Sequence, residues 1–188
     1  MNTSYRLTPL SKSLALAALI GLGAAAVAPK AHAGNAGTSL SVTASVSANC
    51  TISTSAVAFG SYDPVVANAS TALNGTGSVT IACTKGSAPN ITLDLGANAA
   101  ASQRNMKLQP GGPDLLAYQL YQPPSTTPST ACTFPGSQIW GTSGAQIFTP
   151  TSPASKASRT YNVCGTVSAG QDVAVGSYQD TVTATVNF

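Results

Sequence analysis

Cysteine and aspartate are the residues of this chain that could carry chemistry. The cysteines are Cys50, Cys83, Cys132 and Cys164. No two of them form the Cys-x-x-Cys pair that is typical of a zinc site. An even number of cysteines in an exported chain favours two disulfides, for which three pairings are open. The thiol pattern therefore predicts a compartment that oxidises cysteine, such as a bacterial periplasm or the cell exterior.

The first 33 residues have the features of a secretory signal peptide. Arg6 and Lys12 precede an uncharged run whose apolar core, residues 14–27, is too short to cross a bilayer comfortably. Ala31-His32-Ala33 then supplies the small residues that a signal peptidase needs. We expect cleavage after Ala33, with an uncleaved membrane anchor as the alternative. Residues 34–188 remain, which is a size that suits one domain with a core of its own.

Removal of this segment would take the chain's only histidine, His32, with it. Residues 34–188 contain no glutamate, and their five aspartates balance five lysines and arginines. A hydrolase needs a base that titrates near neutrality or a paired acid and base. Catalysis by Asp63, Asp94 and Asp180 is the alternative, but their spacing gives no reason for them to meet. We expect no enzyme activity, no metal, no cofactor and, without a basic patch, no nucleic-acid partner.

The clearest structural pattern lies at the C-terminus, in residues 176–188. Val182, Ala184, Val186 and Phe188 alternate with threonine and asparagine, which indicates one half-buried strand. We expect the chain to end within this strand, so that no later segment covers one of its edges.

A second alternating segment, residues 40–48, lies near the other end of the chain. Leu40, Val42, Ala44 and Val46 share one face. We interpret it as a donor strand that completes the sheet of the next molecule, beside that molecule's C-terminal strand. The alternative is an ordinary first strand of a complete sandwich.

Short strand patterns separated by turn residues fill the chain between these two segments. The predicted strands are residues 50–52, 56–59, 77–84, 90–95, 105–108, 115–121 and 160–167. Asn74-Gly75 predicts a turn, and the proline-rich residues 122–158 predict a long loop in which Trp140 is a packed residue rather than a sugar-stacking platform. With no convincing amphipathic helix, the pattern predicts an all-β sandwich of the immunoglobulin type.

Several of these segments, in their order along the chain, resemble the spore coat protein U domain, which is shared by the Csu-type pilins of archaic chaperone–usher pili. The residues that carry the resemblance are Asn49-Cys50-Thr51-Ile52, Ala58-Phe59-Gly60 with Tyr62-Asp63, residues 77–83, Ala169-Gly170-Gln171-Asp172 and residues 176–182. The long loop, residues 122–158, departs from the length that is usual in the family.

The resemblance implies an incomplete immunoglobulin-like sandwich that lacks its last strand and is completed by donor-strand exchange. Residues 34–48 would be the donor segment and residues 49–188 the domain, whose acceptor strand carries Val182, Ala184, Val186 and Phe188. The implied disulfides are Cys50 with Cys83 and, as the remaining pair, Cys132 with Cys164.

The implied function is that of a structural subunit of a surface pilus that supports adhesion or biofilm formation. Its implied partners are identical or related subunits in a head-to-tail polymer, a periplasmic chaperone and an outer-membrane usher. The implied location is the cell surface or the exterior, reached through the periplasm. The alternative is a surface- or glycan-binding adhesive module, or a secreted coat protein with a complete sandwich.

Overall fold

The computed structural model of the chain describes residues 32–188, so the predicted signal peptide lies almost entirely outside the described residues. Within that range, residues 32–43 are an extended segment without secondary structure, and the folded unit begins at Ala44. Of the helices in residues 32–188, none has the length and apolar character to cross a membrane.

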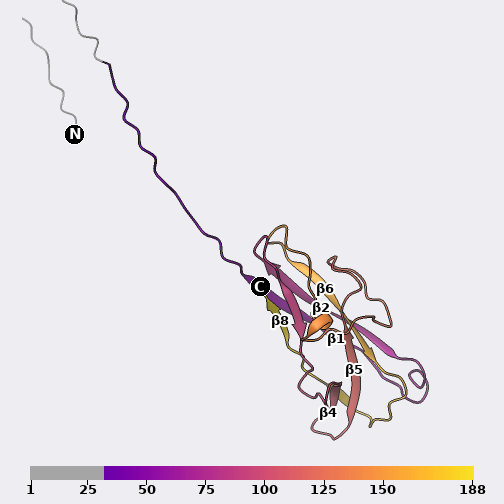
Figure 1. Cartoon of the computed structure of the whole chain (residues 1–188). Helices are drawn as coiled ribbons and strands as arrows, with labels where there is room; N and C mark the ends of the chain where they lie inside the picture. Colours follow the sequence, from indigo (N-terminus) through magenta and orange to yellow (C-terminus); the bar gives the residue numbers. More distant parts are fainter. Residues whose placement is uncertain (1–31) are drawn as a thin grey trace, which may run out of the picture. The chain divides into compact units, whose positions relative to one another are not determined.

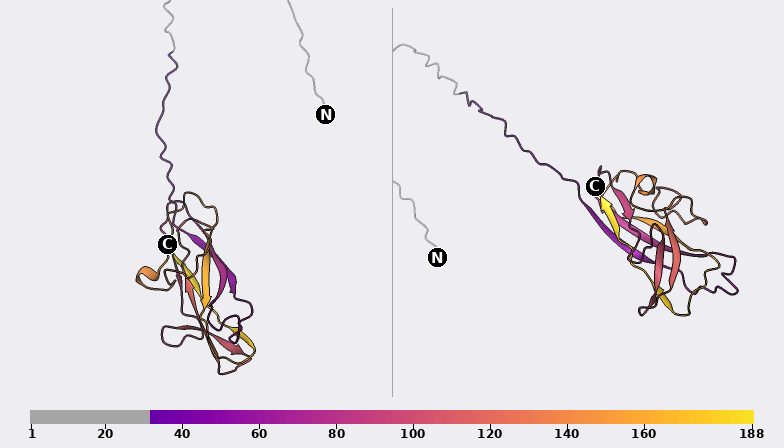
Figure 2. Two further views of the ribbon diagram at one scale, coloured as in Figure 1. Left: turned by 90° about the vertical axis from the view of Figure 1, so that its right-hand side faces the viewer. Right: turned by 60° about the horizontal axis from the view of Figure 1, so that its bottom comes forward.

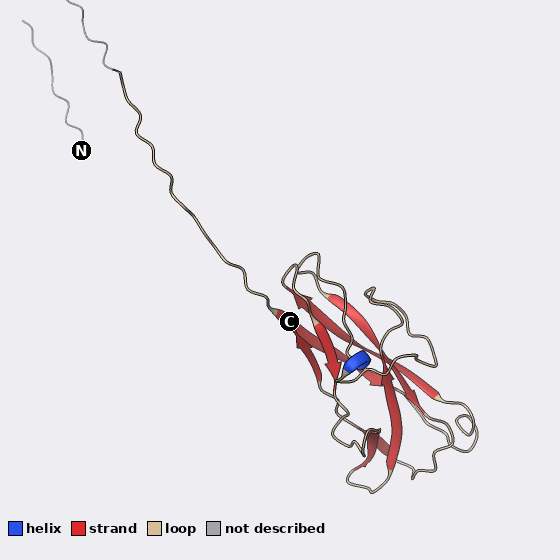
Figure 3. Ribbon diagram, viewed as in Figure 1, coloured by secondary structure: helices blue, strands red, loops and turns tan. Residues whose placement is uncertain are grey.

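The folded unit is built from antiparallel β-strands that form two sheets (Figure 1, Figure 3). The larger sheet has the order β1-β2-β6-β5-β4-β7, with β1 Cys50–Ala58, β2 Leu73–Cys83, β6 Arg159–Val167, β5 Leu115–Tyr121, β4 Arg104–Gln109 and β7 Ser177–Gln179. The smaller sheet pairs β3, Asn90–Leu93, with β8, Ala184–Asn187. The all-β prediction is confirmed, and the described chain adds only a single 3₁₀ turn, η1, Gly144–Gln146.

The core is formed by the inward faces of these strands. Leu116, Tyr118 and Leu120 share the buried face of β5, as their alternation predicts. Across from them, Ile91 of β3 is fully buried. Strands of both sheets therefore contribute to one hydrophobic cluster, which is the arrangement of a sandwich.

The long loop, residues 122–158, covers part of this core. Trp140 is fully buried, and its indole N–H donates to the carbonyl of Ile91 at 2.9 Å. Phe148 forms an isolated antiparallel bridge with Ile91 and packs its ring 5.0 Å from that of Tyr161. Trp140 is therefore a packed residue, as predicted. The loop also pairs with the edge of β3 opposite β8, through Phe148 and the carbonyl of Gly141.

The predicted turn at Asn74-Gly75 is wrong, because both residues lie inside β2. Gly75 stands opposite Gly165 of β6. A Cβ at Gly75 would lie 2.9 Å from the carbonyl oxygen of Ala58 and from the Phe59 ring. The glycine therefore allows the end of β1 to lie close to β2, and the turn residues lie between the two strands, at 64–71.

The prediction of one strand over residues 176–188 is also wrong. The segment forms two strands, β7 in the larger sheet and β8 in the smaller one. The Asp180 carboxylate lies between them and accepts hydrogen bonds from the Asn98 backbone N–H and the Tyr118 hydroxyl. The Thr183 N–H donates to the Asp94 carboxylate. These bonds hold the chain as it crosses from one sheet to the other.

Residues 40–48 belong to neither sheet, although their alternation suits a strand. The side chains of Leu40, Val42 and Val46 are 87%, 86% and 84% exposed. The alternative that this segment is the ordinary first strand of the same sandwich is therefore not supported.

Candidate functional site

Two strand edges without a partner in the described chain lie next to each other. In the larger sheet β1 pairs on one side only, with β2, and in the smaller sheet β8 pairs only with β3. Both views of Figure 2 place the C-terminus, where β8 ends, beside the start of β1. The strands approach each other without a ladder between them. Such edges present backbone N–H and C=O groups that are able to pair with an added strand.

An apolar groove of about 390 Å³ lies between these edges. Val57 and Phe59 line it from the β1 side, and Val182 and Ala184 line it from the β8 side. Its floor is part of the core and includes Val79, Leu93, Met106, Tyr118, Leu120 and Val163. A second cavity, of about 690 Å³, lies at the far end of β1 and shares Val57, Phe59, Met106 and Tyr178 with the groove.

Glycines beneath β1 shape this groove. The register of β1 with β2 shifts between Ser55 and Ala58, and the side chain of Val57, within this interval, lies against two glycines of the neighbouring strands. A Cβ at Gly77 would lie 2.7 Å from a Val57 methyl group, and one at Gly165 would lie 2.7 Å from Val57 and Phe59. The glycines therefore let the end of β1 lie close over β2 and β6.

One end of the groove is polar and is organised by Asp180. Its carboxylate accepts a hydrogen bond of 2.7 Å from the Tyr118 hydroxyl and one of 3.0 Å from the Asn98 side-chain amide. Burial, together with the hydrogen bond to Asp180, raises the pKa of Tyr118, so the hydroxyl stays protonated and donates. These polar groups are already paired with one another, and most of the other residues that line the groove are apolar.

Arg104 supports the groove from below and was not predicted as a site residue. Its side chain is fully buried, and its guanidinium donates to the carbonyls of Leu93, Asp94 and Trp140 at 3.2, 2.6 and 2.6 Å. It thereby connects β4, β3 and the long loop. The sequence shows only an arginine at the start of a short strand pattern, and nothing there indicates burial.

The aspartates considered for catalysis have structural roles. Asp94 and Asp180 both lie near Arg104, but backbone amides and neighbouring side chains occupy their oxygens. Burial acts to raise the pKa of Asp94, but the hydrogen bonds from Thr183 and Gly96 outweigh it and hold the pKa below its usual value. Asp63 does not join this pair, because its oxygens accept the N–H groups of the turn that follows it.

The predicted acceptor residues are spread along the edge that carries β8. Val182 and Ala184 line the groove, and Val186 pairs with Ile91 and packs partly buried against the core. Phe188 follows the strand and is 53% exposed. Only Ala184 and Val186 lie within the hydrogen-bonded strand itself.

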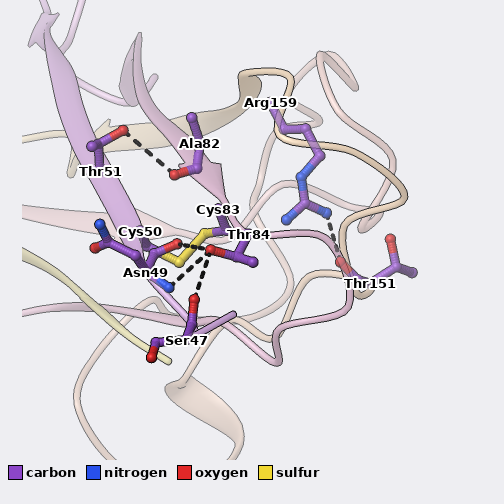
Figure 4. Close-up of a disulfide and its surroundings, with 9 residues drawn as sticks. All are labelled: Ser47, Asn49, Cys50, Thr51, Ala82, Cys83, Thr84, Thr151 and Arg159. Atoms are coloured by element: carbon purple, nitrogen blue, oxygen red, sulfur yellow. Dashed lines mark hydrogen bonds between the residues drawn. A yellow bond between two sulfur atoms is a disulfide. The ribbon is translucent and has the colours of Figure 1, made fainter. Parts of the chain in front are cut away.

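Two disulfides, Cys50–Cys83 and Cys132–Cys164, connect the cysteines of the chain. The first joins the start of β1 to the end of β2, immediately after the extended N-terminal segment (Figure 4). The second connects the long loop to β6. No thiol is left to bind zinc in this chain, whose cysteines all lie in the described part.

The sequence matches a known family over most of its length. Residues 36–185 match the model of the Spore Coat Protein U domain. The chain belongs to this family. It is also 33% identical over 178 residues to "Protein U" of Myxococcus xanthus, a match that covers 84% of this chain and 88% of that protein.

A solved structure supports the fold of this spore coat protein U domain. It is the crystal structure of the CsuC–CsuE chaperone–tip adhesion subunit pre-assembly complex from archaic chaperone–usher Csu pili of Acinetobacter baumannii. The match has a TM-score of 0.52 at 25% identity and covers 76% of this chain but only 40% of the other. The chain thus resembles coat and pilus proteins, which are structural rather than catalytic.

Proposed function

We propose that this protein is a structural subunit of a surface pilus that polymerises by donor-strand exchange. Residues 34–48 of one copy would fill the groove between β1 and β8 of the next copy. The observation that carries the proposal is the apolar groove between two unpaired strand edges, in a chain that also has an exposed alternating segment. On this account the sandwich lacks one strand, and the donor supplies it.

The donor segment and the groove match in chemistry. Strand addition gains affinity from backbone hydrogen bonds and specificity from alternate side chains. Leu40, Val42 and Val46 are almost fully exposed in the single chain, and each contributes roughly 1.5 to 3 kcal/mol on full burial. Ala44, between Val42 and Val46, suits a shallower position in the groove.

The contact joins two different surfaces, so it does not close on itself. A head-to-tail interface of this kind extends into an open fibre. Before assembly the same edges would need a cover, because an exposed groove invites aggregation. A periplasmic chaperone and an outer-membrane usher are the partners proposed for these steps, by analogy with the Csu complex. Adhesion or biofilm formation would be the role of the finished fibre.

A secreted coat is a second candidate function, favoured by the match to Protein U and by the name of the family. In a coat, the same groove and segment would link the subunits. The two functions would therefore share one assembly chemistry and differ in where the polymer is deposited.

Deletion of residues 34–47 tests the proposal. The shortened chain should keep its groove, and therefore its binding to the chaperone, but it should no longer form polymers in size-exclusion chromatography and electron microscopy. Deletion of residues 34–38 is the matched control, because it shortens the segment without removing an alternating apolar residue, and it should leave polymers intact. Polymers of normal length from the chain without residues 34–47 would refute donor-strand exchange.

A further inference from the structure

The junction between the donor segment and the domain carries hydrogen bonds that end at one side chain, Thr84. The Asn49 backbone N–H donates to Thr84 Oγ1 at 3.1 Å, and the Thr84 N–H donates to the Asn49 carbonyl at 2.8 Å (Figure 4). The antiparallel pairing of β1 with β2 thus continues one residue beyond the Cys50–Cys83 pair.

The Thr84 hydroxyl also reaches back to Ser47. Its hydrogen has two acceptors in range, the Ser47 carbonyl at 3.4 Å and the Asn49 carbonyl at 3.3 Å. The Asn49 carbonyl already accepts from the Thr84 N–H, so Ser47 is the acceptor that gains a new partner. One side chain therefore holds residues 47–49 in line with β1.

This alignment decides which groove the donor segment is able to enter. β1 starts where the segment ends, and the groove lies beside the second half of β1, from Thr54 onward. A donor that filled its own groove would therefore have to reverse direction directly before Cys50 and run back along β1. A hairpin at residues 47–49 would break the bonds to Thr84. A reversal earlier in the chain would place Val46 in the turn and remove one of the apolar side chains that the groove would bind.

We infer that Thr84 is a positioning residue that prevents self-filling of the groove and so reserves the donor segment for a second copy of this chain. The inference rests on the proposed function. It adds the residue that favours insertion of the donor segment into the groove of a second copy over insertion into the groove of its own chain. Loss of the hydroxyl removes the Asn49 and Ser47 bonds together, and each is worth roughly a fivefold change in an equilibrium.

Thr84→Val tests this role, because it keeps the shape of the side chain and removes the hydroxyl. Purified chains, with disulfides intact, are unfolded in denaturant and refolded by dilution at one fixed concentration. Size-exclusion chromatography then gives the ratio of monomer to polymer, and hydrogen exchange reports whether the amides of residues 40–46 are protected in the monomer. Thr84→Val should raise the ratio at least roughly fivefold and protect these amides.

Two controls separate positioning from a loss of fold stability. Thr84→Ser retains the hydroxyl and should behave like the unchanged chain. Thr51→Val removes a hydroxyl that bonds the Ala82 carbonyl at 3.4 Å, between the same two strands but on the other side of the disulfide, and it should leave the ratio unchanged.

The outcomes distinguish the two proposals. If deletion of residues 34–47 abolishes polymers while Thr84→Val gives the same ratio of monomer to polymer as the unchanged chain or as Thr51→Val, only the role of Thr84 is overturned. If the chain without residues 34–47 still polymerises, the proposed function is wrong and the inference fails with it.

Discussion

A negative charge at Phe188 should block assembly without unfolding the domain. Phe188 follows β8 and is 53% exposed, so the single chain tolerates a carboxylate at this position in contact with water. In the polymer the donor strand would cover it. Phe188→Asp would then lose the apolar contact of about half a phenylalanine, roughly 1 kcal/mol, and would bury a carboxylate at a cost of several kcal/mol.

The lost apolar contact and the buried carboxylate together cost more than about 3 kcal/mol, which corresponds to more than a hundredfold weaker association between subunits. The assay is the amount of polymer at the cell surface together with the amount of subunit in the periplasm. Thr185→Asp is the matched control. Thr185 is exposed on β8, so this substitution introduces the same charge next to the groove residues, but on the face of the strand that points away from the core. Val186→Asp should block assembly too, with an added loss of domain stability because Val186 packs against the core.

Assembly of Phe188→Asp at the normal level would refute the reasoning. An equal loss with Thr185→Asp would do so as well, since it would mean that charge near the C-terminus, rather than contact between Phe188 and the donor strand, prevents assembly.

Three further changes test the support of the groove. Gly165→Ala should destabilise the domain by about 1–3 kcal/mol in urea unfolding, because its Cβ would meet Val57 and Phe59, whereas Gly37→Ala, which has open space, should not. Arg104→Met should lower the free energy of unfolding in urea by about 3 kcal/mol or more, because the carbonyls of Leu93, Asp94 and Trp140 lose their donor. A decrease below about 1 kcal/mol would contradict this role of Arg104. The lowered pKa of Asp94 stabilises the fold above its unfolded-state value of 3.8, and this stabilisation is lost as the pH falls through the folded-state value. Between pH 6 and pH 2, the melting temperature of Asp94→Asn should therefore fall less than that of the unchanged chain. Equal falls in melting temperature over this pH range would exclude the effect.

Strand alternation in the sequence predicts much of the fold. The buried face of β5, the second half of β2, β3 and most of β6 follow from side-chain periodicity, which burial on one face imposes directly. Trp140 is also correctly predicted as packed. In these cases the local pattern and the tertiary contact express the same constraint.

The errors occur where contacts between distant residues override the local signal. Asn74-Gly75 has the composition of a turn, but Gly75 is needed for the approach of Ala58 and Phe59. The alternation of Val182, Ala184, Val186 and Phe188 favours one strand over residues 176–188, but hydrogen bonds to Asp94 and Asp180 divide the segment between two sheets. The buried role of Arg104 depends on three carbonyls that come together only in the folded domain. No local spacing encodes these contacts.

Moving the donor segment to the other end of the chain tests the central claim most directly. In this variant residues 34–47 are deleted and residues 34–48 are added after Phe188 through a short Asn-Gly turn, which suits a hairpin. The linked segment would meet the groove at an effective concentration in the mM range. Burial of Leu40, Val42 and Val46 should then outweigh the cost of ordering the strand.

The melting temperature of this monomer, compared with that of the chain lacking residues 34–47, is the deciding measurement. A net gain of about 3 kcal/mol corresponds to a rise on the order of 10 °C for a domain of this size. Val42→Asp within the moved segment should cancel most of the rise. If the shortened chain already unfolds cooperatively as a soluble monomer, and the added segment leaves its melting temperature unchanged, the sandwich is complete and donor-strand exchange is not how this protein assembles.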